Sequence, residues 1–511
     1  MRNKIALFSV SDFDGIDGFA KILIERGWEI IATKDAAVFL NKQEIKVQDV
    51  KDFVGIKEEF AFPPTLHPKM EAALTDNNYC DRVELVYDIP YTLEKGNDVG
   101  GHTLLALAAK GNRLPIVSKE DMRAVISIIR DKEEVPKEKK KELIAKANFC
   151  ICKHYLSLMK PDEDGYDGLL GLQKYGLING ENPYQSPASV YEKCEEGADK
   201  LAITNFQRVS GEAPCFTNVA DLDCILFTLC IAAMSFKRNF GKIPYISIAA
   251  KHGNPCGMAV SWTNPNESIT HALFGNPLAI WGGEFITNFP ITEEQARLLF
   301  ESEKRKEIFG SANWMLDVIA AVDFDQKAVE LLGKREQRKL FKNDSLLSPQ
   351  LIKNKWAHRE IRGGFLRQPQ ADYILEIDKL DWLFMKPEGC EADSIIIAWC
   401  VAFSSNHGGN EVAIANKGKL LAVGGGPSTL TASRAAIDRA KENLHEVSGS
   451  VFAADAFFPF TDVPETFVKA GCISGVVPAG GKNIKEVKTY FKDKKCNVGF
   501  IPEQYRGFCR H

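Results

Sequence analysis

The chain opens with Ile5-Ala6-Leu7-Phe8-Ser9-Val10-Ser11-Asp12, and this stretch decides the fold of its N-terminal part. The apolar run predicts a strand, and the polar residues after it predict a turn. A helix should follow, because apolar residues then recur at helical spacing, at Ile16, Phe19, Ala20 and Leu23. Gly27 ends this helix, and the run from Glu29 to Ala32 predicts a second strand. This order predicts a doubly wound α/β sheet, whose ligands bind at the carboxyl ends of the strands.

The same pattern continues along the N-terminal part. Further strands are predicted at Val83 to Tyr87 and at Pro115 to Val117. Between them, Asp98-Val99-Gly100-Gly101 precedes a helix from Thr103 to Lys110. Glycines before a helix can free backbone N–H groups for an anion, although an ordinary turn explains them equally well.

The length and charge of the chain limit what it can be. Its 511 residues predict two to four domains at about 150 residues each. The 64 basic and 68 acidic residues give a net charge of −4. This balance provides no general attraction for nucleic acid or for an anionic membrane. An anionic substrate must therefore be held by local groups.

The composition predicts a soluble cytoplasmic protein. The apolar run from Ile5 to Val10 is too short for a signal peptide and has no cleavage site after it. The longest uncharged stretch, Cys224 to Phe236, is shorter than the roughly 20 residues that cross a bilayer. The 13 scattered cysteines suit reduced thiols better than a disulfide framework.

Several motifs follow one another in the second half of the chain. Asp455 to Phe460 reads Asp-Ala-Phe-Phe-Pro-Phe, Val477 to Gly481 reads Val-Pro-Ala-Gly-Gly, and Arg506 begins Arg-Gly-Phe-Cys-Arg-His. Upstream, a predicted strand leads into Lys251-His252-Gly253-Asn254-Pro255-Cys256-Gly257. Together these motifs resemble the bifunctional AICAR transformylase/IMP cyclohydrolase family of purine biosynthesis. Weaker matches extend the resemblance along the chain, at Ser9–Asp12, Thr65–Lys69, Glu181–Gln185, Trp281–Gly283 and Asn410–Ala415.

The resemblance implies an α/β fold in several parts. A methylglyoxal-synthase-like doubly wound domain is expected at residues 1–158 and a connection at 159–195. Two cytidine-deaminase-like α/β subdomains are expected at 196–365 and 366–511. The family is usually a homodimer with sites at the subunit interface, uses 10-formyltetrahydrofolate as cosubstrate and sometimes binds potassium. No zinc is expected, because Ala259 stands where the zinc deaminase pattern needs a cysteine.

Formyl transfer needs a base and hydrogen-bond donors for an oxyanion. The amine of AICAR ribonucleotide attacks the formyl carbon, so a proton must leave its nitrogen while negative charge builds on the formyl oxygen. His252 is suited to take this proton and to return it to the folate nitrogen. Lys251 and the amide of Asn410 are suited to stabilise the oxyanion, and the family assigns comparable roles to matching residues. Cys256 is expected to pack, since no base arrangement marks it as activated.

The substrate-binding residues are predicted from the same resemblance. Lys174, Tyr175 and Arg506 are candidates for holding the phosphate and the ring of the nucleotide. Lys174 replaces a usual arginine, and Arg506 lies one position further from the C-terminus than the family's arginine. Pro427-Ser428-Thr429-Leu430 replaces the family's Gln-Met-Ser-Arg, so one polar contact of the family is expected to be missing. The remaining candidates for contact with nucleotide or folate are Gly282, Gly283, Asp317, Phe457 and Asp462. A capping role explains Asp462 almost equally well.

The N-terminal domain departs from the family's cyclohydrolase pattern. Phe62-Pro63-Pro64 replaces the family's Arg-Val-Lys. Tyr87-Asp88-Ile89-Pro90-Tyr91 replaces Asn-Leu-Tyr-Pro-Phe, so the hydroxyl of the family's central tyrosine is lost at Ile89. Asp14 and Asp35 introduce negative charge where the family attracts a phosphate. The candidate remnant of the ring-closing site consists of Ser11, Asp98 and Lys110. We therefore expect formyl transfer to be kept and ring closure to be lost.

Alternative functions stay open at the level of sequence. The chain could be fully bifunctional and also close the ring to IMP, or it could be a non-catalytic protein that binds purine nucleotide or folate. Retention of Lys251, His252 and Asn410 together disfavours the non-catalytic alternative. The changed charges also allow a different small ligand in the N-terminal domain. A formyl-phosphate or formate route would use protein groups similar to those expected for the folate.

Overall fold

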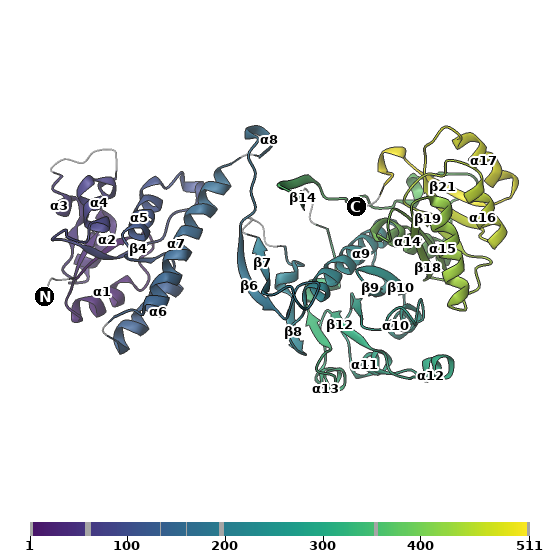
Figure 1. Ribbon diagram of the computed structural model, residues 1–511, viewed down its shortest axis with the longest axis horizontal. Helices are drawn as coiled ribbons and strands as arrows, with labels where there is room; N and C mark the ends of the chain where they lie inside the picture. Colours follow the sequence, from purple (N-terminus) through teal and green to yellow (C-terminus); the bar gives the residue numbers. More distant parts are fainter. Residues whose placement is uncertain are drawn as a thin grey trace. The chain divides into compact units, whose positions relative to one another are not determined.

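The chain forms two compact units in the computed structural model, Met1–Gly171 and Leu172–His511 (Figure 1). The structure describes residues 4–56, 63–132, 134–159, 161–193, 199–351 and 356–507. Phe62 and the last four residues of the C-terminal motif lie outside this set.

A five-stranded parallel sheet forms the centre of the first unit, with the strand order β3-β2-β1-β4-β5. The order reverses at β1, as in a doubly wound fold, and such a reversal opens a crevice at the carboxyl ends of the strands. The parallel α/β fold predicted for this part is therefore observed. The strands are β1 (Lys4–Ser9), β2 (Trp28–Ala32), β3 (Gln48–Asp49), β4 (Val83–Asp88) and β5 (Leu114–Ile116).

The helices of the first unit cover this sheet with apolar faces. In α1, the four residues that the spacing predicts for one face, Ile16, Phe19, Ala20 and Leu23, are all buried. The helix predicted after the glycines begins earlier than expected, at Val99, because Asp98 accepts a hydrogen bond from the Gly101 N–H and caps it. The helices are α1 (Ile16–Glu25), α2 (Lys34–Lys42), α3 (Val50–Val54), α4 (Pro68–Thr75), α5 (Val99–Lys110), α6 (Lys119–Asp131) and α7 (Lys137–Leu158), followed by α8 (Pro161–Asp164).

The second unit is built on one mixed sheet of twelve strands, with the order β16-β21-β20-β19-β17-β18-β10-β9-β11-β12-β13-β8. Its two halves join where β10 pairs antiparallel with β18. The strands are β8 (Gln207–Ser210), β9 (Tyr245–Lys251), β10 (Asn254–Ser261), β11 (Gly283–Thr287), β12 (Leu316–Ala321), β13 (Lys339–Lys342), β16 (Asp381–Trp382), β17 (Asn410–Asn416), β18 (Lys419–Gly426), β19 (Val451–Ala454), β20 (Ser474–Pro478) and β21 (Asn497–Ile501).

Two hairpins stand apart from this sheet. The stretch predicted as a connection contains β6 (Gly171–Leu177) and β7 (Ala188–Lys193), which form a two-stranded sheet. A second two-stranded sheet pairs β14 (Trp356–Ile361) with β15 (Gly364–Pro369). The predicted connection is therefore partly regular structure.

Two apolar helices, α9 (Phe216–Phe240) and α14 (Gly389–Ser404), pack together in the core of the second unit (Figure 1). Thr228 on α9 donates a 2.8 Å hydrogen bond to Ser404 on α14. Among the helices in the described ranges, α9 has the length and apolar composition of a membrane span, but most of it is buried inside the protein. The other helices are α10 (Pro265–Leu273), α11 (Glu293–Phe300), α12 (Glu303–Phe309), α13 (Gln326–Leu332), α15 (Thr429–Glu442), α16 (Asp462–Ala470) and α17 (Ile484–Asp493).

We predict that Gly257→Ala destabilises the second unit. A Cβ atom at Gly257 would overlap the carbonyl oxygen of Ala272, so β10 could not keep its close approach to α10. Overpacking of this kind costs about 1–3 kcal/mol, and the midpoint of thermal unfolding should fall. Gly176→Ala is the matched control, because nothing lies within 4 Å of its added atom. Equal unfolding midpoints for the two variants would contradict the prediction.

Candidate functional site

A two-residue turn presents Lys251 and His252 at the end of a hairpin. β9 and β10 pair with Lys251 opposite Asn254, so His252 and Gly253 alone form the turn. Both have positive φ, 53° and 69°, as a type I′ hairpin turn requires. A Cβ atom at Gly253 would lie 2.9 Å from the Cys224 Sγ atom of α9. The turn is thus pressed against α9, and His252 is exposed at its tip.

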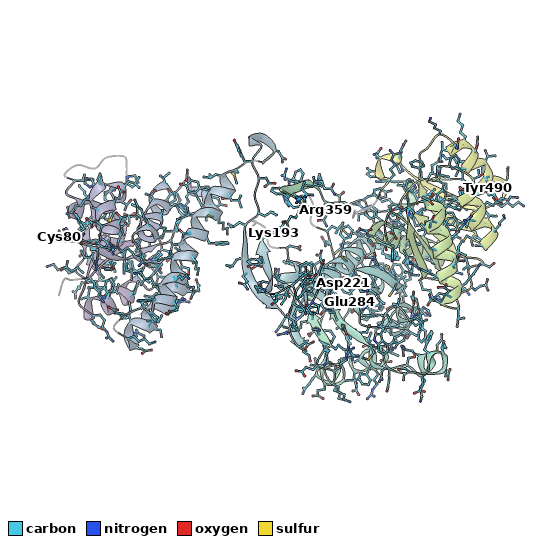
Figure 2. The ribbon with its side chains drawn as sticks, viewed as in Figure 1. Cys80, Lys193, Asp221, Glu284, Arg359 and Tyr490 are labelled. Atoms are coloured by element: carbon cyan, nitrogen blue, oxygen red, sulfur yellow. The ribbon has the colours of Figure 1, made fainter. Side chains whose placement is uncertain are left out.

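Two carboxyl groups, Asp221 on α9 and Glu284 on β11, lie close to this turn (Figure 2). Burial raises the pKa of Glu284 well above its usual range, and the charge of Asp221 adds to the shift while that of Lys251 opposes it. Burial also raises the pKa of Asp221, against the opposing effect of His252. The pair therefore binds protons more readily than exposed carboxylates do, next to the proposed base and oxyanion donor.

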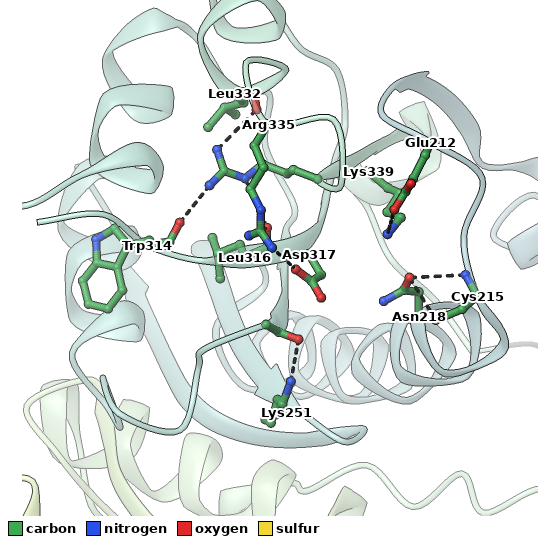
Figure 3. Close-up of polar contacts among 12 residues, drawn as sticks. Glu212, Cys215, Asn218, Lys251, Trp314, Leu316, Asp317, Leu332, Arg335 and Lys339 are labelled. Atoms are coloured by element: carbon green, nitrogen blue, oxygen red, sulfur yellow. Dashed lines mark hydrogen bonds and ion pairs between the residues drawn. The ribbon is translucent and has the colours of Figure 1, made fainter. Parts of the chain in front are cut away.

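Two of the predicted residues, Gly282 and Asp317, lie near the end of the Lys251 side chain (Figure 3). Lys251 Nζ donates a 2.6 Å hydrogen bond to the carbonyl oxygen of Gly282, and Gly283 opens β11. A Cβ atom at Gly282 would lie 3.1 Å from Lys251 Nζ and 3.5 Å from Asp317 Oδ2. Asp317 Oδ1 accepts a 2.9 Å hydrogen bond from Arg335. The strand ends of β9, β11 and β12 thus bring these predicted residues together.

A cavity of about 280 Å³ lies between the two halves of the sheet. The backbone N–H of Asn406 donates a 2.7 Å hydrogen bond to Asn254 Oδ1, which ties the loop before β17 to the hairpin turn. Burial raises the pKa of the Cys256 thiol to about 12, so this cysteine stays protonated at neutral pH. The lining residues are Lys251, His252, Asn254, Cys256, Asn276, Ala279, His407, Ala422, Val423 and Arg439.

Asn410 lies at the start of β17 and is not among the residues that line the cavity. Its Nδ2 atom donates a 3.4 Å hydrogen bond to the carbonyl oxygen of Gly426. His407, three residues earlier, does line the cavity.

The sequence alone did not identify four polar residues of this region. In the sequence, each of them stands in an apolar stretch or next to a glycine. A charged or polar side chain is unusual in such a stretch and could have indicated a functional residue. The four are Asp221, Glu284, His407 and Glu411.

The three C-terminal motifs meet around one aromatic ring. Cβ atoms at Gly480 and Gly481 would lie 3.1 Å and 2.8 Å from the Phe457 ring, so both glycines give it room. The Arg506 guanidinium lies 5.4 Å from the centre of the same ring, and its Nη1 atom donates to Glu503 at 2.7 Å. Asp462 lies apart from this group, exposed on the first turn of α16, where its carboxylate accepts from the Val463 N–H.

Lys174 and Tyr175 lie on β6, away from the cavity lining. Lys174 Nζ pairs with Glu192 Oε2 on β7 at 3.2 Å. Burial raises the pKa of Tyr175, and Arg208 on the edge strand β8 opposes the shift. Within one chain, these two residues do not join Lys251 and His252.

The first unit has a larger cavity, of about 410 Å³, at the carboxyl ends of its strands. Asp98 accepts hydrogen bonds from the N–H groups of Gly101 at 2.8 Å and Tyr91 at 3.1 Å. A Cβ atom at Gly101 would lie 2.7 Å from an Asp88 oxygen and 2.8 Å from an Asp98 oxygen, so both carboxyl groups converge on the same small space. Charged and hydroxyl side chains of the lining are Ser9, Ser11, Thr33, Lys34, Asp35, Asp49, Lys51, Asp88, Tyr91 and Asp98.

Of the three residues predicted as a ring-closing remnant, the structure brings Ser11 and Asp98 to this cavity but not Lys110. Asp98 caps the start of α5 and Lys110 is its last residue. A helix rises 1.5 Å per residue, so about 18 Å separates the two positions. Lys110 instead pairs with Glu71 at 3.6 Å on the surface.

Asp88 is the most strongly perturbed group of this cavity. It is 2% exposed, and burial raises its pKa to about 7, against a hydrogen bond with Ser9 that favours the charged form. Its Oδ2 atom has no hydrogen-bond partner among the described residues. At neutral pH the cavity therefore contains a carboxyl group that gains and loses a proton beside the doubly hydrogen-bonded Asp98.

Comparisons with known proteins agree on one family. The family described as AICARFT/IMPCHase bienzyme matches residues 108–439. The chain is 29% identical to the bifunctional purine biosynthesis protein PurH of Lactococcus lactis subsp. cremoris strain MG1363, over 95% of this chain and 96% of that protein. It is 28% identical to the protein of the same name from Caldicellulosiruptor saccharolyticus, over 99% of this chain and all of that protein.

We predict that Asp88→Asn reduces the pH dependence of stability. Because the pKa of Asp88 is raised in the folded state, its proton favours folding at low pH, and this contribution is lost as the pH rises from about 4 to about 7. The loss is worth at most about 4 kcal/mol. Chemical unfolding of wild type and variant at a series of pH values measures it. An unchanged difference between the two proteins from pH 4 to 8 would contradict the raised pKa.

Proposed function

The chain belongs to the AICARFT/IMPCHase bienzyme family, and we propose that it acts as an AICAR formyltransferase. Membership confirms the family that the motifs predicted. In the proposed reaction, a formyl group moves from 10-formyltetrahydrofolate to the 5-amino group of AICAR ribonucleotide. The observation that carries the proposal is the cavity at the β10–β18 junction, where Lys251 and His252 stand together on a rigid turn.

The geometry of this turn supports the roles proposed for its two side chains. Lys251 is held by Gly282 O, so its ammonium group has a fixed place from which to stabilise a formyl oxygen that becomes negative. His252 is exposed at the tip and lines the cavity, where an imidazole can take a proton from the amine. Asp221 and Glu284 lie close to them, and burial favours the neutral, protonated forms of both carboxyl groups by raising their pKa values.

The finer architecture belongs to the same proposal. We infer that the first unit is methylglyoxal-synthase-like and that the second contains two cytidine-deaminase-like subdomains. Lys174 and Tyr175 lie away from the cavity of their own chain, which fits a homodimer in which β6 serves the site of a second copy. The folate cosubstrate and a cytoplasmic location follow from the proposed reaction in purine biosynthesis.

We propose that the first unit does not close the ring efficiently. Its cavity carries Asp35, Asp49, Asp98 and the partly protonated Asp88 against Lys34 and Lys51, so the lining does not favour an anion such as a phosphate. Lys110 lies at the far end of α5. A different small ligand without a phosphate fits these charges better than a nucleotide does.

The formyl-transfer assay tests the main proposal. Wild-type protein with AICAR ribonucleotide and 10-formyltetrahydrofolate should release tetrahydrofolate, which is followed by absorbance. Lys251→Gln should lower kcat by about 100-fold or more, because an oxyanion donor is worth about 3 kcal/mol. His252→Ala should lower it by about 100-fold or more through loss of the base.

Lys327→Gln is the matched control for these variants, since Lys327 pairs with Glu293 at 3.0 Å on the surface of the same unit. It should leave the rate unchanged. Absence of transfer by the wild-type protein, or transfer that survives both Lys251→Gln and His252→Ala, would refute the proposed function.

The products of the same assay test ring closure. We expect formyl-AICAR to accumulate and IMP to form slowly, as resolved by chromatography. If IMP instead forms as fast as tetrahydrofolate is released, and Asp98→Asn abolishes it, the first unit is an active cyclohydrolase. Asp98 is the informative position because it lines the cavity and Lys110 does not.

A further inference from the structure

A second histidine faces the same cavity as His252. His407 lies in the loop before β17 and lines the cavity with Lys251, His252 and Arg439. Its side chain is 22% exposed. A Cβ atom at Gly425 would lie 2.5 Å from the Cβ atom of His407, so this glycine allows the histidine to sit directly on β18. His252 and His407 therefore reach one cavity from opposite halves of the sheet.

Glu411 holds His407 in place through two contacts. Glu411 Oε2 lies 2.8 Å from His407 Nδ1, and Glu411 Oε1 accepts a hydrogen bond from the His407 backbone N–H. The Glu411 side chain is fully buried. A carboxylate at Nδ1 fixes the orientation of an imidazole, leaves Nε2 available to a reactant and stabilises the positive charge of the doubly protonated ring.

The surroundings of His407 contain charges from both halves. On its own side, Asp455 Oδ1 accepts a 2.9 Å hydrogen bond from the Glu411 N–H. Burial, a larger effect than the neighbouring Glu411 charge, raises the pKa of Asp455 to about 7. Lys251 and His252 line the cavity from the hairpin turn of the other half. Arg439 lines it from α15, on the same half as His407, and its Nη1 donates to Val423 O at 2.8 Å. Glu411 thus contacts His407 directly, and Asp455 contacts the backbone of Glu411.

We propose that His407 is a second catalytic acid–base residue of the formyl-transfer site, with Glu411 as its positioning residue. This inference rests on the proposed formyltransferase function. His252 takes the proton that the attacking amine loses, and His407 gives a proton to the folate nitrogen that leaves. The carboxylate partner suits His407 to the acidic role, because it balances the charge of a protonated ring.

The proton balance of this step is complete. A bond forms between the amine nitrogen and the formyl carbon, and the bond between that carbon and the folate nitrogen breaks. One proton passes from the amine to His252, and one passes from His407 to the folate nitrogen. Nothing is oxidised or reduced. Exchange with water returns both histidines to their starting forms.

Steady-state kinetics of the full chain with AICAR ribonucleotide and 10-formyltetrahydrofolate test the assignment. His407→Ala should lower kcat by about 100-fold with KM changed by less than about threefold, because general acid catalysis acts on the chemical step. Imidazole added to the buffer should restore part of the lost kcat, since it can replace the missing acid in the vacated space. Glu411→Gln should lower kcat by about tenfold, as positioning is lost while the imidazole remains.

His271→Gln is the control, because His271 lies on α10 and does not line the cavity. A His407→Ala protein with wild-type kcat, with a loss confined to KM, or with a loss that imidazole does not restore overturns the inference and leaves the formyltransferase proposal standing. If His407→Ala does not fold, His407→Gln decides by the same split between kcat and KM. Absence of transfer by the wild-type protein overturns both proposals.

Discussion

The antiparallel pairing of β10 with β18 determines where chemistry can take place in the second unit. Because the strands run in opposite directions from the Ala259–Lys419 pair, the beginning of β10 lies at the same edge as the end of β18. The first carries the Lys251–His252 turn, and the second pairs with Asn410 at the start of β17. Each half alone presents only part of the cavity. The junction between them places a turn from one half opposite a loop from the other.

Local sequence predicted several elements, mainly in the first unit, but not their buried polar partners. The strand and helix periods at Ile5 to Ala32 indicated a doubly wound sheet, and the parallel order around β1 agrees with it. The turn at His252-Gly253 is also a local property, since two positive φ angles suit a histidine followed by glycine. Glu284 and Glu411, in contrast, contact residues that are distant in the sequence or depend on a loop conformation. Pattern and spacing carry no information about such contacts.

Helix geometry explains why Lys110 does not lie at the cavity with Ser11 and Asp98, the other two residues predicted for the ring-closing site. Asp98 and Lys110 each matched a family residue, and both lie on the helix that follows the glycines. The rise per residue already requires that the first and last residues of such a helix face different surroundings. In the sequence, Asp88 is the polar residue at the end of an apolar strand, and nothing in the pattern marks it as part of a site. The fold buries it beside Asp98 above Gly101, where only a glycine leaves room for both carboxyl groups.

The two halves of the second unit solve one structural problem with different residues. After β11, Asn288 Oδ1 accepts the Ile246 N–H at 2.7 Å, and its Nδ2 donates to Pro244 O at 2.9 Å, so both ends of the amide are hydrogen-bonded. After β19, Asp455 Oδ1 accepts the Glu411 N–H at 2.9 Å, but its Oδ2 atom has no partner among the described residues. An asparagine would meet the backbone requirement in both places. The half that has a titratable carboxyl group at this place is the half that carries His407 and Glu411, and Asp455 binds the backbone of Glu411 itself, so the difference lies directly behind the proposed acid.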